Sequence, residues 1–146
     1  MYHYTDCGLN NVWLKNGYGT YETDYGKAVG IHNVEGLHKA IGLHLIANKP
    51  RLSGSEVRFL RIELDLSQKE LANLLGVTEQ SVRGWEKHRN KITKAPERLL
   101  RYLYRESVCN NGLLRKLVDR VATLNRDAYH AKIELEETDT GWKQAA

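Results

Sequence analysis

The chain has 146 residues, of which 41% are hydrophobic and 27% are charged, proportions typical of one compact domain or two small ones. It contains no apolar run near the roughly 18 residues that a membrane span requires, and its first residues do not resemble a signal peptide. Cys7 and Cys109 form neither a disulfide framework nor a CxxC pair. We therefore expect a cytoplasmic protein without membrane spans, and four-cysteine zinc sites are excluded.

The positive charge lies in the middle of the chain, whose overall net charge is +4. Residues 1–50 contain four Lys and four acidic residues, and residues 106–146 contain six Lys and Arg against seven acidic residues. Residues 51–105 contain twelve Lys and Arg against seven Asp and Glu, a local excess of five. Such an excess indicates an anionic partner, although solvated helix surfaces often carry this much charge.

The N-terminal region is rich in Gly and Tyr, a composition that suits strands and turns. Residues 11–15 and 27–32 predict two short strands of a hairpin. They are separated by the turn-forming pair Asn16-Gly17 and a polar loop over residues 21–26.

Apolar residues at helical spacing then predict a helix over residues 34–47, with Asn33 as its N-cap, that covers one face of the hairpin. Residues 1–50 thus form a hairpin and helix unit. Its low charge and many aromatic side chains favour dimerisation or partner binding. An equally simple interpretation is that it only packs against the rest of the protein.

Residues 51–106 predict a run of short helices whose starts carry capping residues. The candidate caps are Ser53 or Ser55, Ser67 and Thr78, and Pro96 opens a further helix. Glu70 completes a capping box with Ser67, and Gly76 ends that helix. This pattern predicts an all-α domain.

The last part of the chain, residues 107–146, predicts one amphipathic helix from residue 113 to about residue 126. Apolar and charged residues then alternate over 131–136, which indicates an edge strand or a tail. The predicted fold is therefore α+β: a small β-hairpin and helix unit followed by an all-α domain of about five helices.

The segment LSQKELANLLGVTEQSVRGWEK, residues 66–87, consists of two predicted helices joined by a tight turn. It resembles the helix-turn-helix of the Cro and phage-repressor (XRE) type, and a looser similarity extends over residues 55–104. In this family the second helix of the pair lies in the DNA major groove. The resemblance therefore implies double-stranded DNA as the partner.

The resemblance also assigns roles to individual positions. It implies DNA contacts from Ser67, Gln68, Thr78, Glu79, Gln80, Ser81, Arg83, Lys87, Arg89 and Asn90. Base edges would be contacted by the residues at the start of the second helix, Thr78, Glu79, Gln80, Ser81 and Arg83. Phosphates would be bound by Gln68 and by the residues after the second helix, Lys87, Arg89, Asn90 and Lys91. Arg61 and Glu86 match a buried ion pair that holds the helices together.

The helical periodicity supports part of this assignment. With Val82 and Trp85 turned to the core, the side chains of Gln80, Ser81 and Arg83 are expected to point outward, and the same spacing places Gly84 on that face.

Two positions depart from the family pattern. Where the family has Gly after the Trp-Glu pair, this chain has Lys87-His88, so we expect Asn90 to adopt the left-handed conformation that ends the helix. Glu79 is an acid at a base-facing position, where it either accepts a hydrogen bond from a cytosine amino group or repels wrong sequences.

The first eight residues resemble a degenerate CxxCG zinc knuckle, as found before the repressor domain in antitoxins of the MqsA/YgiT type. Tyr4 replaces the first cysteine and the second pair is absent, so we expect no metal and no other cofactor. The sequence contains no nucleophile elbow, phosphate-binding loop or HExxH motif, which argues against an enzyme.

These features predict a bacterial or phage transcriptional regulator, a repressor that binds a palindromic operator as a homodimer. Dimerisation would use the helix over residues 111–126 or the N-terminal unit, and the N-terminal unit is preferred. The alternative is an antitoxin or adaptor that binds a toxin through the N-terminal unit and represses its own operon.

Overall fold

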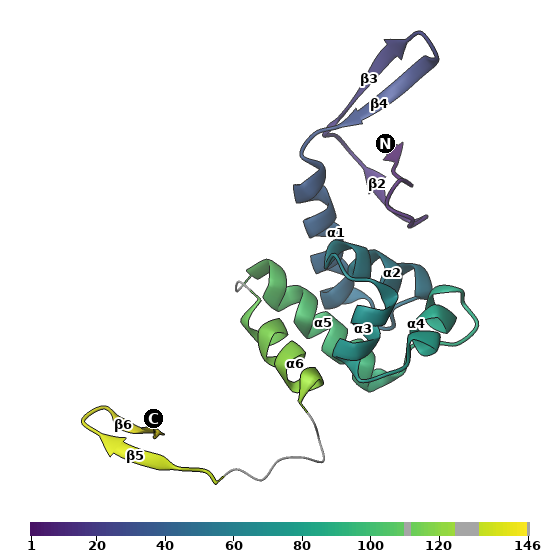
Figure 1. Cartoon of the computed structure of the whole chain (residues 1–146). Coiled ribbons are helices and arrows are strands. Elements are labelled where there is room, and N and C mark those ends of the chain that lie inside the picture. Colours follow the sequence, from purple (N-terminus) through teal and green to yellow (C-terminus); the bar gives the residue numbers. More distant parts are fainter. Residues whose placement is uncertain (110–111, 125–131, 146) are drawn as a thin grey trace.

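The computed structural model describes residues 1–109, 112–124 and 132–145 (Figure 1). The helices are α1 (Val34–Asn48), α2 (Gly54–Glu63), α3 (Gln68–Leu75), α4 (Glu79–Glu86), α5 (Lys94–Cys109) and α6 (Leu113–Thr123). The strands form three antiparallel pairs: β1 (Tyr2–His3) with β2 (Trp13–Leu14), β3 (Tyr18–Thr23) with β4 (Gly26–Ile31), and β5 (Leu135–Thr138) with β6 (Gly141–Gln144). This is the predicted α+β fold, with five helices after the N-terminal unit.

The N-terminal strands pair differently from the expectation. Trp13 and Leu14 of β2 pair with β1 at the chain start, and β4 pairs with β3, which occupies much of the predicted polar loop. The Tyr and Thr residues of β3 favour extended backbone. The hydroxyl of Thr23 donates to the carbonyl of Gly26 at 2.6 Å across the turn. Two hairpins therefore replace the single predicted one.

Helix α1 begins where the sequence predicts, because the side chain of Asn33 accepts a hydrogen bond from the backbone N–H of Gly36. It does not cover the β3–β4 hairpin, however. It packs against α2 and α5, and in Figure 1 it lies below the β3–β4 hairpin, with β2 beside its first turns. Gly42 allows this approach, because a Cβ there would collide with the ring of Tyr104. Burial raises the pKa of Tyr104 to about 12.

The predicted helix starts in the middle of the chain are confirmed. Ser53, rather than Ser55, caps α2 and forms a capping box with Glu56. Ser67 forms the second box with Glu70, and this hydrogen bonding lowers the pKa of the Glu70 carboxyl. Thr78 caps α4 by accepting from the N–H of Ser81 at 3.1 Å. Each cap satisfies backbone donors that the first helical turn leaves without partners.

Helix α5 begins at Lys94, which places Pro96 in its first turn. Helix α6 packs against α3 and α5, and residues 125 and 126 of the predicted helix lie outside the described residues. Of the alternating segment 131–136, predicted as an edge strand or a tail, only residues 135 and 136 lie in strand β5, which pairs with β6; residues 132–134 precede the strand, and Ala131 lies outside the described residues.

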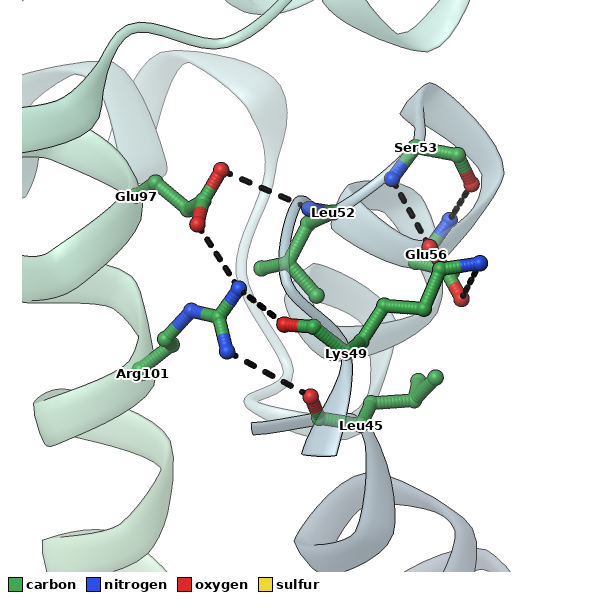
Figure 2. Close-up of polar contacts among 7 residues, drawn as sticks. All are labelled: Leu45, Lys49, Leu52, Ser53, Glu56, Glu97 and Arg101. Atoms are coloured by element: carbon green, nitrogen blue, oxygen red, sulfur yellow. Dashed lines mark hydrogen bonds and ion pairs between the residues drawn. The ribbon is translucent and has the colours of Figure 1, made fainter. Parts of the chain in front are cut away.

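A buried polar network joins α1, α2 and α5 (Figure 2). Arg101 of α5 pairs with Glu97 at 2.7 Å and donates to the carbonyls of Lys49, at 2.7 Å, and Ile46, at 3.0 Å. Glu97 in turn accepts from the N–H of Leu52, before α2, at 3.4 Å. Arg101 thus satisfies carbonyls at the C-terminal end of α1 and attaches this helix to the helices that follow.

Candidate nucleic-acid interface

Helices α3 and α4 pack against each other and are joined by a short turn at residues 76–78. Gly76 adopts a left-handed conformation there, with a φ of 70°. Val82 and Trp85 of α4 are buried, as the helical spacing predicts. The opposite side of α4 therefore faces solvent.

Of the predicted outward positions on α4, Gln80 and Arg83 are exposed and Ser81 is half-buried. The outward placement of Gly84 is wrong, since this residue is buried. The side chain of Asn90 lies over it, so that an added Cβ would approach the Asn90 amide nitrogen to 2.9 Å. Asn90 approaches α4 at the one position without a side chain.

Glu79 and Arg83 form an ion pair on the exposed face of α4, with 2.7 Å between a guanidinium nitrogen and a carboxylate oxygen. The side chains are 39% and 53% exposed, so the pair contributes at most about 0.5 kcal/mol to stability. Arg83 can exchange this partner for another acceptor at little cost. The i, i+4 spacing could have revealed the pair in the sequence.

Arg61 of α2 and Glu86 of α4 form a two-point ion pair, with hydrogen bonds of 2.8 and 3.0 Å. Both side chains are largely buried. Arg61 also donates to the carbonyl of Leu66 at 2.9 Å, and Gln68 at the start of α3 donates to Glu86 at 3.3 Å. Glu86 therefore links α2, α3 and α4 and holds α4 in position.

The exit from α4 differs from the expectation for Asn90. The residue with positive φ is His88, at 60°, while Lys87 is the C-cap. The N–H of Arg89 then donates to the carbonyl of Gly84 at 2.9 Å. The chain turns one residue beyond the C-cap, as in a Schellman-type ending, and His88 takes the position where Gly is usual.

Replacing His88 with Gly should increase the free energy of unfolding by about 0.5–1 kcal/mol, because Gly adopts positive φ without steric cost. Chemical denaturation measures this change. Lys87→Gly is the matched control: Lys87 has an ordinary φ of −90°, so Gly there should destabilise the protein. Equal losses in both variants would contradict the assignment of strain to His88.

Residues 57–101 match the family model HTH_3, helix-turn-helix. These residues are a helix-turn-helix domain of the Cro/C1 (XRE) type. No curated protein and no solved structure matches the chain. The match supports DNA binding, but nothing in the comparisons supports the resemblance of residues 1–8 to MqsA-type antitoxins.

Charge pairing around the helix-turn-helix domain is uneven. Among the described residues, three of the twelve Lys and Arg in residues 51–105 form ion pairs with carboxylates, namely Arg61, Arg83 and Arg101. The acidic residues Glu56, Glu79, Glu86 and Glu97 lie in ion pairs, and Glu63 is hydrogen-bonded to His38. The domain thus keeps most of its positive charges available for an anionic partner.

Several of these positive charges gather after α4. Lys87, Arg89 and Lys91 are exposed on the segment between α4 and α5. Lys91 also lines a hollow of about 290 Å³ with His88 and with Arg51, which precedes α2. Arg51 was not predicted as a site residue, because only the fold brings it beside the end of α4.

The remaining predicted site residue is Ser67, which is exposed and caps α3 by accepting a hydrogen bond from the backbone N–H of Glu70.

Within the ranges that the structure describes, no three His, Cys, Asp or Glu residues are grouped to hold a metal ion. His38 instead bonds Tyr4 and Glu63, each at 2.7 Å. None of the described helices combines the length and apolar composition that a membrane crossing needs.

Proposed function

We propose that this protein is a sequence-specific transcriptional repressor that binds a palindromic DNA operator as a homodimer. The observation that carries the proposal is the exposed face of α4, which presents Gln80 and Arg83 from a helix-turn-helix domain. Burial of Val82 and Trp85 fixes which side of the helix is offered. A helix presented in this way fits the DNA major groove.

The exposed residues of α4 are suited to contact different bases. Gln80 has the amide geometry that pairs with adenine, and Arg83 can make two hydrogen bonds to guanine. Ser81 and Thr78, whose hydroxyls lie 2.9 Å apart, stand at the start of the helix, where the backbone approaches a base edge or a phosphate. Glu79 either accepts from a cytosine amino group or releases Arg83 when the correct base is present.

Phosphate contacts come from the two ends of the α3–α4 unit. Ser67 and Gln68 lie at the start of α3, where the helix dipole favours an anion. Lys87, Arg89 and Asn90 follow α4 on an exposed segment. Contacts of this kind set affinity and register without reading sequence.

Replacing Lys87 with Ala should weaken binding to every duplex by a similar factor and reduce the slope of log affinity against log salt by about one. Fluorescence anisotropy at several salt concentrations measures both quantities. Arg105→Ala is the matched control, because Arg105 is also exposed but lies near the α6 end of α5. A loss confined to one sequence would assign Lys87 to base reading instead.

The homodimer follows from the small site of one module. Two copies on successive turns of DNA, about 34 Å apart, read a longer sequence and multiply specificity. Selection of bound duplexes from a random library tests the whole proposal and should yield an inverted repeat. Selection of an unrepeated site would contradict the symmetric dimer, and no enrichment at all would contradict sequence-specific binding.

The antitoxin alternative depends on the N-terminal resemblance, which the comparisons do not support. A stoichiometric complex between this protein and the product of a neighbouring gene, in which a toxic activity is blocked, would be the evidence needed to prefer it.

A further inference from the structure

One side of α6 is apolar and exposed. It carries Leu113, Leu117 and Val121 and continues to Leu124 directly after the helix; we call these four residues the α6 stripe. Each is between 53% and 67% exposed. The helix is already attached to α3 and α5 by its other side. The α6 stripe is therefore an additional surface that the helix does not need for its own packing.

The C-terminal hairpin has a second uncovered apolar surface. Leu135 pairs with Gln144 and Glu137 pairs with Trp142, so Leu135 and Trp142 lie on the same side of the hairpin. With Ile133, two residues before β5, they form what we call the hairpin face; Glu137 and Gln144 lie on the same side as Leu135 and Trp142. Ile133 is 77% exposed, Leu135 is 56% exposed and Trp142 is 70% exposed.

The opposite side of this hairpin is polar, with an ion pair between Glu136 and Lys143 at 3.6 Å. The exposed apolar side chains of β5 and β6 thus lie on one side of the hairpin, which stands apart from the helices in Figure 1. An isolated two-stranded hairpin is only marginally stable in water and needs packing on one face. Something should therefore cover the hairpin face.

The two apolar surfaces carry opposite charges at their edges. Lys116 and Arg120 lie beside the α6 stripe on the helix surface. On the hairpin, Glu137 pairs with Trp142 and lies on the same side as the hairpin face, whereas Glu136 and Lys143 lie on the opposite side. Apolar surfaces with charged edges of opposite sign are complementary.

We infer that the hairpin face of one chain packs on the α6 stripe of a second copy, and that the second copy returns the same contact. In Figure 1 the hairpin does not lie on α6 of its own chain, and two copies can cover both surfaces around a two-fold axis. The inference rests on the homodimer of the proposed function and names its interface.

The area available is sufficient for a stable dimer. The seven side chains of the α6 stripe and the hairpin face, each more than half exposed, offer on the order of 800 Å² per chain, the contribution of one partner to a standard interface.

The β3–β4 hairpin is less suitable as a dimer interface, because the ring of Tyr21 already lies over Gly19 and Gly30 of its own hairpin.

Sedimentation equilibrium of the full chain at micromolar concentration tests the inference. The unmodified protein should have the mass of two chains. Leu117→Glu, in the α6 stripe, and Trp142→Glu, in the hairpin face, should each raise the dimer dissociation constant on the order of 100-fold. Ile62→Glu is the matched control, since Ile62 is 53% exposed on α2 and the variant should remain a dimer. Circular dichroism checks that each variant is folded.

Mixing the two variants tests the reciprocal arrangement. The Leu117→Glu chain has an intact hairpin face and the Trp142→Glu chain an intact α6 stripe, so their mixture should form heterodimers with one of the two contacts restored. Absence of heterodimers would overturn the exchange between copies.

The remaining outcomes separate this inference from the proposed function. If the unmodified protein is a dimer and both variants stay dimeric, the interface lies elsewhere, and the homodimer stands without this inference. If the unmodified protein is a monomer, the inference and the homodimer both fail. DNA binding measured on the same samples then shows whether the rest of the proposed function holds.

Discussion

Replacing Glu86 with Ala is expected to lower the free energy of unfolding by about 3–5 kcal/mol, the usual cost of leaving a buried charge without its partner. Glu86 is only 5% exposed and holds Arg61 through two hydrogen bonds. Its loss leaves the Arg61 guanidinium with the carbonyl of Leu66 as its remaining partner at this site. Urea denaturation followed by circular dichroism measures the change.

Glu79→Ala is the control for this prediction, because Glu79 lies in the same helix and also pairs with an arginine, but at the surface. It should cost less than about 1 kcal/mol. Replacing both members of the buried pair, Arg61→Met with Glu86→Leu, should recover much of the stability, since the cost arises from the uncompensated charge. If Glu86→Ala and Glu79→Ala destabilise the protein equally, Glu86 does not have the linking role assigned to it.

Replacing Arg83 with Ala is expected to remove discrimination at one base pair of the selected operator, by about 1–3 kcal/mol or roughly 5- to 150-fold. Affinity for random duplexes should change much less, because the two-point contact to guanine is specific to sequence. Competition binding with single-base variants of the operator measures this effect. It depends on Arg83 leaving Glu79, which the exposed position of the pair allows.

Two variants sharpen the test of Arg83. Arg105→Ala removes an exposed arginine near the far end of α5 and should leave discrimination unchanged. Glu79→Ala frees Arg83 from its ion pair and should preserve its discrimination. If Arg83→Ala weakens specific and random duplexes by the same factor, Arg83 contacts phosphate and the placement of α4 in the groove must be revised.

Much of the helical domain could be predicted from local sequence. Ser67 and Thr78 mark the starts of α3 and α4, because a capping side chain bonds backbone groups two or three residues away. The spacing of Val82 and Trp85 likewise indicated which side of α4 is buried. The family match over residues 57–101 agrees with this reading.

The N-terminal hairpins were predicted less well, because strand pairing joins residues that local patterns do not relate. Trp13 and Leu14 were correctly placed in an extended segment, yet their partner is the chain start rather than residues 27–32. The Gly84 and Asn90 predictions failed for a related reason. The side chain of Asn90 lies close over Gly84 and covers it, and His88 makes the turn that brings the chain back.

Local sequence is enough to predict where most helices begin and which of their residues are apolar, since capping and helical periodicity act within one or two turns. Which apolar residues are covered depends on the packing of the helices: Leu114 and Val118 pack on the core while Leu117 and Val121 stay exposed. The same packing brings Arg51 beside the end of α4 and Arg101 onto the last carbonyls of α1. These contacts depend on how helices distant in sequence pack together, which no local pattern specifies.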